Sequence, residues 1–195
     1  MSTARRVAQT RHKGAASVAV IGAAMASWTC VQGAQAASVQ NARCAASPPQ
    51  TEGPYYTDGP PRRQVLATAA TKGTHLILTG RVLGTRCQPL TGARVDFWQA
   101  NATGSYDNSG YKFRGYQLTD AKGRYRLVTV VPGLYPGRTE HIHVKVTPKG
   151  RATLTTQLFF PGVAENDGDG IFDARLLIKI KKTKTQWNGT FSFVI

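Results

Sequence analysis

The chain has 195 residues, with 25 Lys and Arg against 10 Asp and Glu, and 41% of its residues are hydrophobic. This length suits one domain with a sizeable core, and the hydrophobic fraction excludes a disordered chain despite a formal net charge of +15. A charge of this size makes nucleic-acid binding a hypothesis to weigh against the motifs below.

Residues 1–36 are typical of a secretory signal peptide. Residues 1–14 carry four basic side chains and no acid, residues 15–28 form an apolar run, and Ala34-Gln35-Ala36 predicts cleavage after Ala36. The run is shorter than the ~20 apolar residues that span a bilayer, which argues against a membrane anchor. We therefore expect an exported protein, periplasmic or extracellular, with no membrane span once the signal is removed.

Cleavage at this point changes the cysteine count. It removes Cys30 and leaves Cys44 and Cys87 in a compartment that favours oxidation. A disulfide between these two would tie the N-terminal arm to the first hairpin region and stabilise the fold by about 2–4 kcal/mol. The alternative is two unpaired buried thiols.

The mature chain divides into an irregular arm and a region of short strands. Residues 37–74 are rich in Ala, Ser, Pro, Gly and Gln and keep no hydrophobic period, so they predict an arm. Over residues 75–195, apolar runs alternate with turn signals, and no segment keeps a helical period. The predicted strands are 76–83, 93–99, 115–119, 124–131, 139–147, 154–160, 176–182 and 190–194. Strands of this length and spacing predict an all-β fold, an antiparallel β-sandwich with long loops.

The predicted strand 139–147 carries two histidines on one face. Because strand side chains alternate, His141 and His143 point to one side of the sheet, and Ile142 and Val144 point to the other. Two imidazoles two residues apart on a strand can bind one metal ion. Strand histidines are, however, more often hydrogen-bonded residues of the surface or core than metal ligands.

A metal bound by this pair would need oxygen ligands. The mature chain has one other histidine, His75, and no spare cysteine if the disulfide forms. Imidazole combined with oxygen ligands favours iron or manganese. Tyr106 and Tyr135 lie in loops that end strands, and a trivalent cation would hold their phenols as phenolates. Taken singly, each is also compatible with a half-buried tyrosine at a sheet edge.

Four stretches of the sequence resemble the intradiol ring-cleavage dioxygenases, the family of protocatechuate 3,4-dioxygenase and catechol 1,2-dioxygenase. They occur in family order between about residues 44 and 173. The stretches are TEGPYY (51–56), GARVDFWQ (92–99) leading to GSY (104–106), the segment from Tyr135 to RTEHIH (138–143), and LTTQLFFPG (154–162). The spaced Tyr, Tyr, Arg and His-x-His set is far more specific than His-x-His alone.

The resemblance implies a β-sandwich dioxygenase domain over residues 75–195 that binds one non-haem Fe(III). The iron ligands carried over are Tyr106, Tyr135, His141 and His143. The implied reaction cleaves a small aromatic diol of the catechol type with O2 to a cis,cis-muconate-type diacid.

The resemblance also assigns three catalytic residues. Tyr135 would leave the metal and accept a substrate proton, Arg138 would stabilise carbanion-like charge on the ring, and Gln157 would lie near the ring. Two positions depart from the family pattern: Gln99 stands where the family often has His, and Thr139 where it often has Pro. The long N-terminal helical region of the catechol-cleaving branch has no counterpart here, so the resemblance does not set the oligomeric state.

Three other interpretations remain open. The strand framework also resembles exported transthyretin-like and adhesin-like sandwiches, which are binding modules without catalysis. The lysines of 179–184 would suit nonspecific nucleic-acid binding, but they are better explained as a solvated strand edge, so we expect no specific nucleic-acid partner. Residues 165–170 resemble part of a calcium loop. However, position twelve is Leu176, which favours a simple turn.

Overall fold

The computed structural model describes residues 43–195, so the predicted signal peptide and Cys30 lie outside the described residues. The described part contains nine strands and two short 3-10 helices. In chain order they are β1 (His75–Leu83), β2 (Arg94–Trp98), β3 (Arg114–Leu118), β4 (Arg124–Val130), β5 (His141–Thr147), β6 (Leu154–Phe159), η1 (Ala164–Gly168), η2 (Ala174–Leu176), β7 (Lys179–Lys182), β8 (Trp187–Thr190) and β9 (Phe193–Val194).

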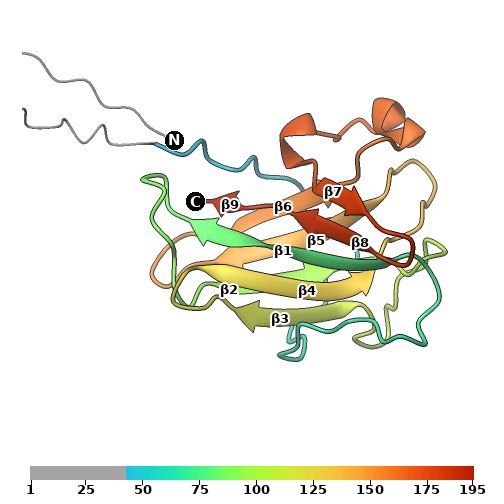
Figure 1. Ribbon diagram of the computed structural model, residues 1–195, viewed down its shortest axis with the longest axis horizontal. Helices are drawn as coiled ribbons and strands as arrows, with labels where there is room; N and C mark the ends of the chain where they lie inside the picture. The colour runs from blue at the N-terminus through green and yellow to red at the C-terminus, as the bar shows by residue number, and fades with distance from the viewer. Residues whose placement is uncertain (1–42) are drawn as a thin grey trace, which may run out of the picture. The chain divides into compact units, whose positions relative to one another are not determined.

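The strands form two stacked sheets (Figure 1). One sheet has the order β3-β2-β5-β6, and the other has the order β4-β1-β8-β7 with β9 beside β1. The prediction of an all-β sandwich is therefore confirmed. All pairs are antiparallel except β1–β8 and β1–β9, which are parallel, so the second sheet is mixed.

The later strands differ most from the prediction. The predicted strand 176–182 starts only at Lys179, because residues 174–176 form η2. The predicted strand 190–194 includes only the last residue of β8 and, after a break at Phe191 and Ser192, the two residues of β9; the rest of β8 was not predicted. The break coincides with a side-chain contact, since the carbonyl of Phe191 accepts a hydrogen bond from the Tyr125 hydroxyl at 2.8 Å.

The hydrophobic core lies between the two sheets. Ile142, Val144 and Val146 of β5 are completely buried there, with Leu76 and Leu78 of β1 in the same core. The alternation predicted for β5 is confirmed, and its consequence is that His141 and His143 point to the outer face of their own sheet.

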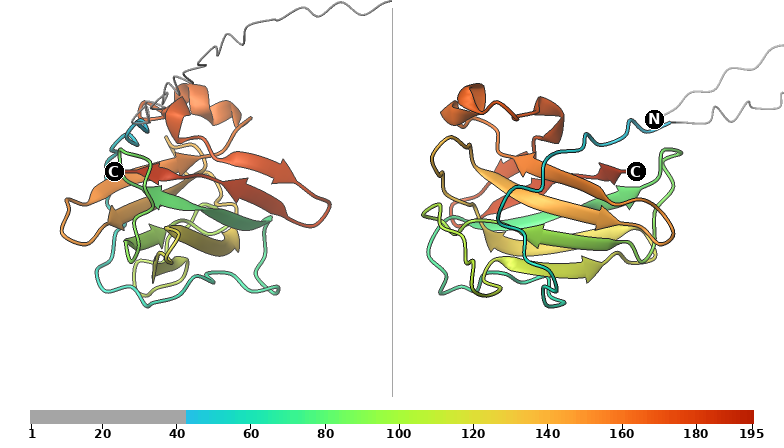
Figure 2. Two further views of the ribbon diagram at one scale, coloured as in Figure 1. Left: turned by 60° about the vertical axis from the view of Figure 1, so that its left-hand side comes forward. Right: turned by 180° about the vertical axis from the view of Figure 1, so that it is seen from behind.

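An irregular arm covers that outer face. Residues 43–74 contain no named strand, and they run across the β3-β2-β5-β6 sheet in Figure 2, right. The arm is held to β6 by three hydrogen bonds. The backbone N–H of Gln50 donates to the carbonyl of Thr155 (2.9 Å), the Thr156 hydroxyl to Pro48 (2.8 Å) and the Gln157 amide to Thr51 (2.9 Å).

A disulfide fastens the start of the described arm. Cys44 is bonded to Cys87, as predicted, and the backbone N–H of Cys44 donates to the carbonyl of Thr85.

Near the C-terminal end of the chain, β7 lies at a sheet edge with Lys179 and Lys181 exposed, as expected for a solvated edge. No helix within residues 43–195 is long and apolar enough to cross a membrane.

Candidate metal centre

The two predicted histidine ligands lie on the outer face of β5, beneath the arm. His141 and His143 are 2% and 1% exposed. His143 lies between Trp98 of β2 and Gln157 of β6 in the strand register, and the Trp98 indole stacks on its ring with centroids 4.8 Å apart. The sheet therefore holds the imidazole of His143 rigidly and excludes water from one side.

The two predicted tyrosine ligands come from loops that contact each other. Tyr106 follows β2 and Tyr135 follows β4. Between them, Gly104 has a φ of +80°, and a Cβ atom at this position would lie only 1.9 Å from the carbonyl oxygen of Leu134. Only glycine allows this approach, which brings both phenol rings over the histidines.

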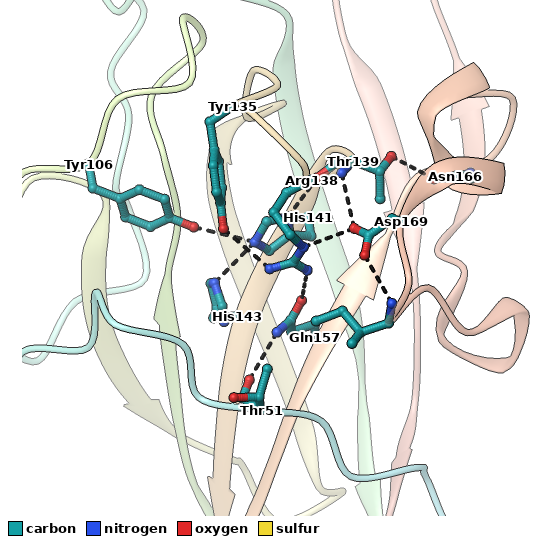
Figure 3. Close-up of polar contacts among 11 residues, drawn as sticks. Thr51, Tyr106, Tyr135, Arg138, Thr139, His141, His143, Gln157, Asn166 and Asp169 are labelled. Atoms are coloured by element: carbon teal, nitrogen blue, oxygen red, sulfur yellow. Dashed lines mark hydrogen bonds and ion pairs between the residues drawn. The ribbon is translucent and has the colours of Figure 1, made fainter.

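Donor atoms from three of the four residues meet at one place (Figure 3). The Nε2 atoms of His141 and His143 are 3.1 Å apart, and the Tyr106 hydroxyl lies 3.5 Å from His141 Nε2. Two metal–nitrogen bonds of about 2 Å at a right angle span about 3 Å, so this separation suits two ligands of one ion. The Tyr135 ring lies 5.5 Å from the His141 ring and 5.8 Å from the Tyr106 ring, between centroids.

Hydrogen bonding and burial leave both imidazoles in the form that binds metals. His141 Nδ1 lies 2.6 Å from the backbone carbonyl of Thr139 and donates to it, so the lone pair is on Nε2. His143 Nδ1 is buried without a hydrogen-bond partner. Burial lowers the pKa of His141 to about 4 and the pKa of His143 well below its ordinary value, so both rings are neutral at pH 7.

Without a metal cation, burial favours the protonated form of the two phenols, which is not the form that binds metals. Burial raises the pKa of Tyr106 and of Tyr135, while the nearby Arg138 guanidinium acts against the rise in both. Residues 43–195 hold no cluster of three or more His, Cys, Asp or Glu side chains that could bind a metal. The tyrosine hydroxyls are the side-chain oxygens beside His141 and His143, and a cation with a high charge would supply the electrostatic energy to deprotonate them. The donor set fits Fe(III) in this respect.

The predicted catalytic residues are also brought together. The guanidinium of Arg138 donates from Nη1 to the Tyr135 hydroxyl (3.2 Å), from Nη2 to Gln157 Oε1 (2.5 Å) and from Nε to Asp169 Oδ2 (2.9 Å). Gln157 in turn donates to Thr51 of the arm. Arg138 therefore connects a tyrosine loop, β6 and the segment after η1.

A cavity of about 450 Å³ lies beside this group. Its walls combine two of the candidate catalytic side chains, Tyr135 and Arg138, with loop residues and two acids. They are Leu134, Tyr135, Pro136, Gly137, Arg138, Glu165, Gly168 and Asp169. The volume is in the range of small-molecule sites and accommodates an aromatic ring next to Tyr135 and Arg138.

Two residues around the site, Tyr55 and Arg114, were not predicted from the sequence. Tyr55 stacks on Tyr106 with ring centroids 4.4 Å apart, which gives this tyrosine of the arm a place beside a candidate ligand. Arg114, 1% exposed, donates hydrogen bonds to the backbone carbonyls of Asp107 and Tyr55. Tyr55 stands in a stretch that resembles the family and could have been selected on that basis. Arg114 carries no comparable signal.

The two departures from the family pattern have different surroundings. The Gln99 amide donates to the carbonyls of Ala100 and Val130, and its oxygen accepts from Thr129, so it is bound to β4 residues. Thr139, which was predicted to begin the strand, lies before β5. It is bound instead by the side chains of Asn166 and Asp169. The segment 165–170, predicted to be a simple turn, consists largely of the short 3-10 helix η1.

Comparisons with known proteins agree on one group. The family model described as Dioxygenase matches residues 51–186. Hydroxyquinol 1,2-dioxygenase from Rhizobium sp. (strain MTP-10005) is 30% identical over 149 residues, which are 63% of this chain and 50% of that protein. The chain spans about half the length of the curated relatives that it matches.

Two solved structures match this chain over almost their whole length. The dioxygenase domain of a dioxygenase carbohydrate-binding protein fusion from Streptomyces sp. SirexAA-E is 49% identical, with a TM-score of 0.76. The match covers 77% of this chain and 98% of that one. An intradiol ring-cleavage dioxygenase from Tetranychus urticae is 25% identical with a TM-score of 0.71, over 78% of this chain and 94% of that one.

Proposed function

The chain belongs to the intradiol ring-cleavage dioxygenase family, and we propose that it cleaves a catechol-type ring with O2 to a cis,cis-muconate-type diacid, using one non-haem Fe(III) per chain. The observation that carries the proposal is the meeting of His141, His143 and Tyr106 donor atoms in a buried place, with Tyr135 alongside. Iron held by these residues would supply Lewis-acid chemistry that activates a bound diol for reaction with O2.

Each catalytic residue has a role that its contacts support. Tyr135, as a phenolate, accepts a proton from a substrate hydroxyl at its own Oη, the atom that Arg138 already contacts at 3.2 Å. Arg138 is permanently charged and borders the cavity, so it stabilises negative charge that develops on the ring. Gln157 holds the guanidinium from the β6 side. Thr51 and the rest of the arm close the site against water.

We further propose that residues 1–36 are a removed signal peptide and that the protein is periplasmic or extracellular. The mature chain then consists of the arm (37–74) and the β-sandwich domain (75–195). The basic, apolar and small-residue parts of the leader support this proposal. The disulfide between Cys44 and Cys87 supports it independently, because such bonds persist in oxidising compartments.

The proposed function is tested by iron loading followed by an oxygen assay. Purified mature chain is reconstituted with iron, and we expect about one iron per chain and a red phenolate-to-iron colour. O2 uptake is then measured with catechol, protocatechuate, hydroxyquinol and chlorinated or alkylated catechols. The product of an active diol should contain both atoms of one O2 and no aromatic ring.

A colourless protein that remains free of iron after reconstitution would contradict this proposal. That result would favour the alternative of an exported transthyretin-like or adhesin-like binding module. We set the alternative aside because the chain belongs to a family of dioxygenases and its candidate ligand atoms meet at one place. A sandwich without metal chemistry gives no reason for two neutral imidazoles and a phenol to be buried together.

A further inference from the structure

The carboxylate of Asp169, directly after η1, is buried and fully engaged. Its side chain is 1% exposed. Oδ2 accepts from Arg138 Nε at 2.9 Å and from the Thr139 backbone N–H at 3.0 Å, and Oδ1 accepts from the Ile171 backbone N–H at 3.1 Å. Burial raises the pKa of Asp169, but these donors outweigh burial and lower it, so the group is a carboxylate. Burying a charge is costly, so a specific set of partners is needed to retain it.

Asn166 of η1 completes the contact with Thr139. Its Oδ1 accepts from the Thr139 hydroxyl at 2.7 Å, and its Nδ2 donates to the carbonyl of Phe160 at 2.9 Å. Both polar groups of Thr139 that can donate are therefore bound by this turn. Proline, the residue that the family often has at this position, has neither an N–H nor a hydroxyl to donate. Asn166 and Asp169 thus accept the two hydrogen bonds that Thr139 can donate and that a proline at this position could not.

The turn that carries Asp169 is connected to the candidate centre through two residues, Arg138 and Thr139 (Figure 3). Through Arg138, Asp169 fixes the guanidinium whose other nitrogens contact Tyr135 and Gln157. Through Thr139, it fixes the backbone carbonyl that accepts from His141 Nδ1 at 2.6 Å. A guanidinium is planar, so the bond at Nε sets the plane in which the two Nη groups lie.

We propose that Asp169 is a positioning residue that sets the orientation of Arg138 for ring cleavage, with Asn166 and Thr139 supporting the same turn. The inference rests on the proposed function, because the orientation matters through the charge that Arg138 presents to the substrate ring. The side chain of Asp169 accepts hydrogen bonds from Arg138 and from two backbone N–H groups, and from none of the four candidate ligands, so its contact with the site is made through Arg138.

The test is a double-mutant cycle on the iron-loaded chain with the best diol from the oxygen assay. The proteins are wild type, Asp169→Asn, Arg138→Ala and the double variant. Asp169→Asn should lower kcat by about 10–100-fold, the range for groups that orient a functional residue. When Arg138 is already absent, the same substitution should change kcat far less. An equal loss in both backgrounds would overturn the inference.

A second readout does not depend on turnover. In metal-free protein, the melting temperature of the four variants should show the same non-additivity, because the buried ion pair exists without iron. Asp173→Asn is the matched control: Asp173 lies in the same segment but pairs with the exposed Arg175, and its substitution should leave kcat unchanged. If the control lowers kcat as much as Asp169→Asn, the effect belongs to the segment and the inference is wrong.

The design separates this inference from the proposed function. A wild-type chain that binds iron but cleaves no diol contradicts the function, and additive kcat losses in an active enzyme contradict only the role of Asp169. If Asp169→Asn does not fold, Asp169→Glu replaces it in the cycle, since it keeps the charge but moves the carboxylate by one methylene. The same criterion of non-additivity then decides.

Discussion

The two sheets of the sandwich differ most on their outer faces. The outer face of the β3-β2-β5-β6 sheet buries five polar side chains, namely Asp96, Arg114, His141, His143 and Gln157. The outer face of the other sheet leaves its charged side chains exposed, among them Arg81, Arg124, Arg126, Lys179 and Lys181. Both sheets bury their apolar face in the same core, so the difference comes from what covers the outside.

The covering segments are the arm and the loops that carry the tyrosines. Buried polar groups are stable only when they are hydrogen-bonded or paired, and these segments supply partners such as the carbonyls of Thr51 and Tyr55. The strands of the sandwich supply the histidine pair and Gln157, but neither tyrosine and not Arg138. The site requires irregular segments packed on one chosen face.

Among substitutions on the covered face, removal of a candidate metal ligand should have the largest effect on activity. We expect Tyr106→Phe or His143→Ala to abolish the iron colour and turnover, because each removes a donor atom from a site with few others. Tyr111→Phe is the matched control, since that hydroxyl donates to the carbonyl of Asp58 outside the site. Iron content, visible absorption and O2 uptake measure the outcome. Full activity in either ligand variant would refute the ligand assignment.

The next largest effect compares an arginine from each face. Arg138→Ala should retain iron but lower kcat by about 10²–10³-fold, as expected when a preorganised charge is lost. Arg126→Ala, on the exposed face, should leave kcat within experimental error. Steady-state O2 consumption tests both variants. A comparable loss in the two would mean that the general positive charge, rather than the position of Arg138, supports turnover.

Acid should lower the stability of the metal-free protein, because His141 is buried and neutral in the folded state. The folded-state pKa of His141 is about 4, below the unfolded value near 6.5, so the unfolded state binds more protons between these values. The free energy of unfolding should therefore fall as pH drops from about 6.5 to 4, by about 3 kcal/mol from this residue. Urea unfolding measures it. His141→Gln, which has no titrating ring, should lose less over the same range, and an equal loss would contradict the assignment.

The smallest effect is expected from a substitution at Gly53, where the arm lies against His143. Gly53 has a φ of +72°, and an added Cβ would lie 3.2 Å from His143 Cε1; Gly150 has a φ of +69° with open space around it. Both alanine variants should lose about 1–2 kcal/mol of stability because of the backbone conformation. Only Gly53→Ala should also weaken iron binding. Chemical unfolding and iron titration compare them, and equal iron affinity in both variants would show that the arm does not constrain His143.

The part of the site that lies on a regular strand could be predicted from residue periodicity. Alternation placed His141 and His143 on one face, and the export signal with the cysteine count predicted the bond between Cys44 and Cys87. Tyr106 and Tyr135 needed the family resemblance, because loop residues have no period that points them anywhere.

Other features depend on partners that are distant in the sequence. Asn166 and Asp169 lie in a segment whose sequence resembles part of a calcium loop and does not indicate these contacts, and only the fold brings them to Thr139 and Arg138. The parallel pairing of β1 with β8 and β9 was missed for the same reason. A strand pattern predicts which face is buried but does not indicate which strand lies alongside.

The arm also has a consequence for the order of folding. The hydrogen bond from Gln157 to Thr51 joins residues 106 positions apart, whereas β5 and β6 are neighbours in the chain. Closing so long a loop costs more conformational entropy than pairing adjacent strands, and contacts of this kind form slowly. We therefore expect the sheet to assemble before its cover docks. The candidate centre would then be completed at the last stage of folding, and its colour would report the arrival of the arm.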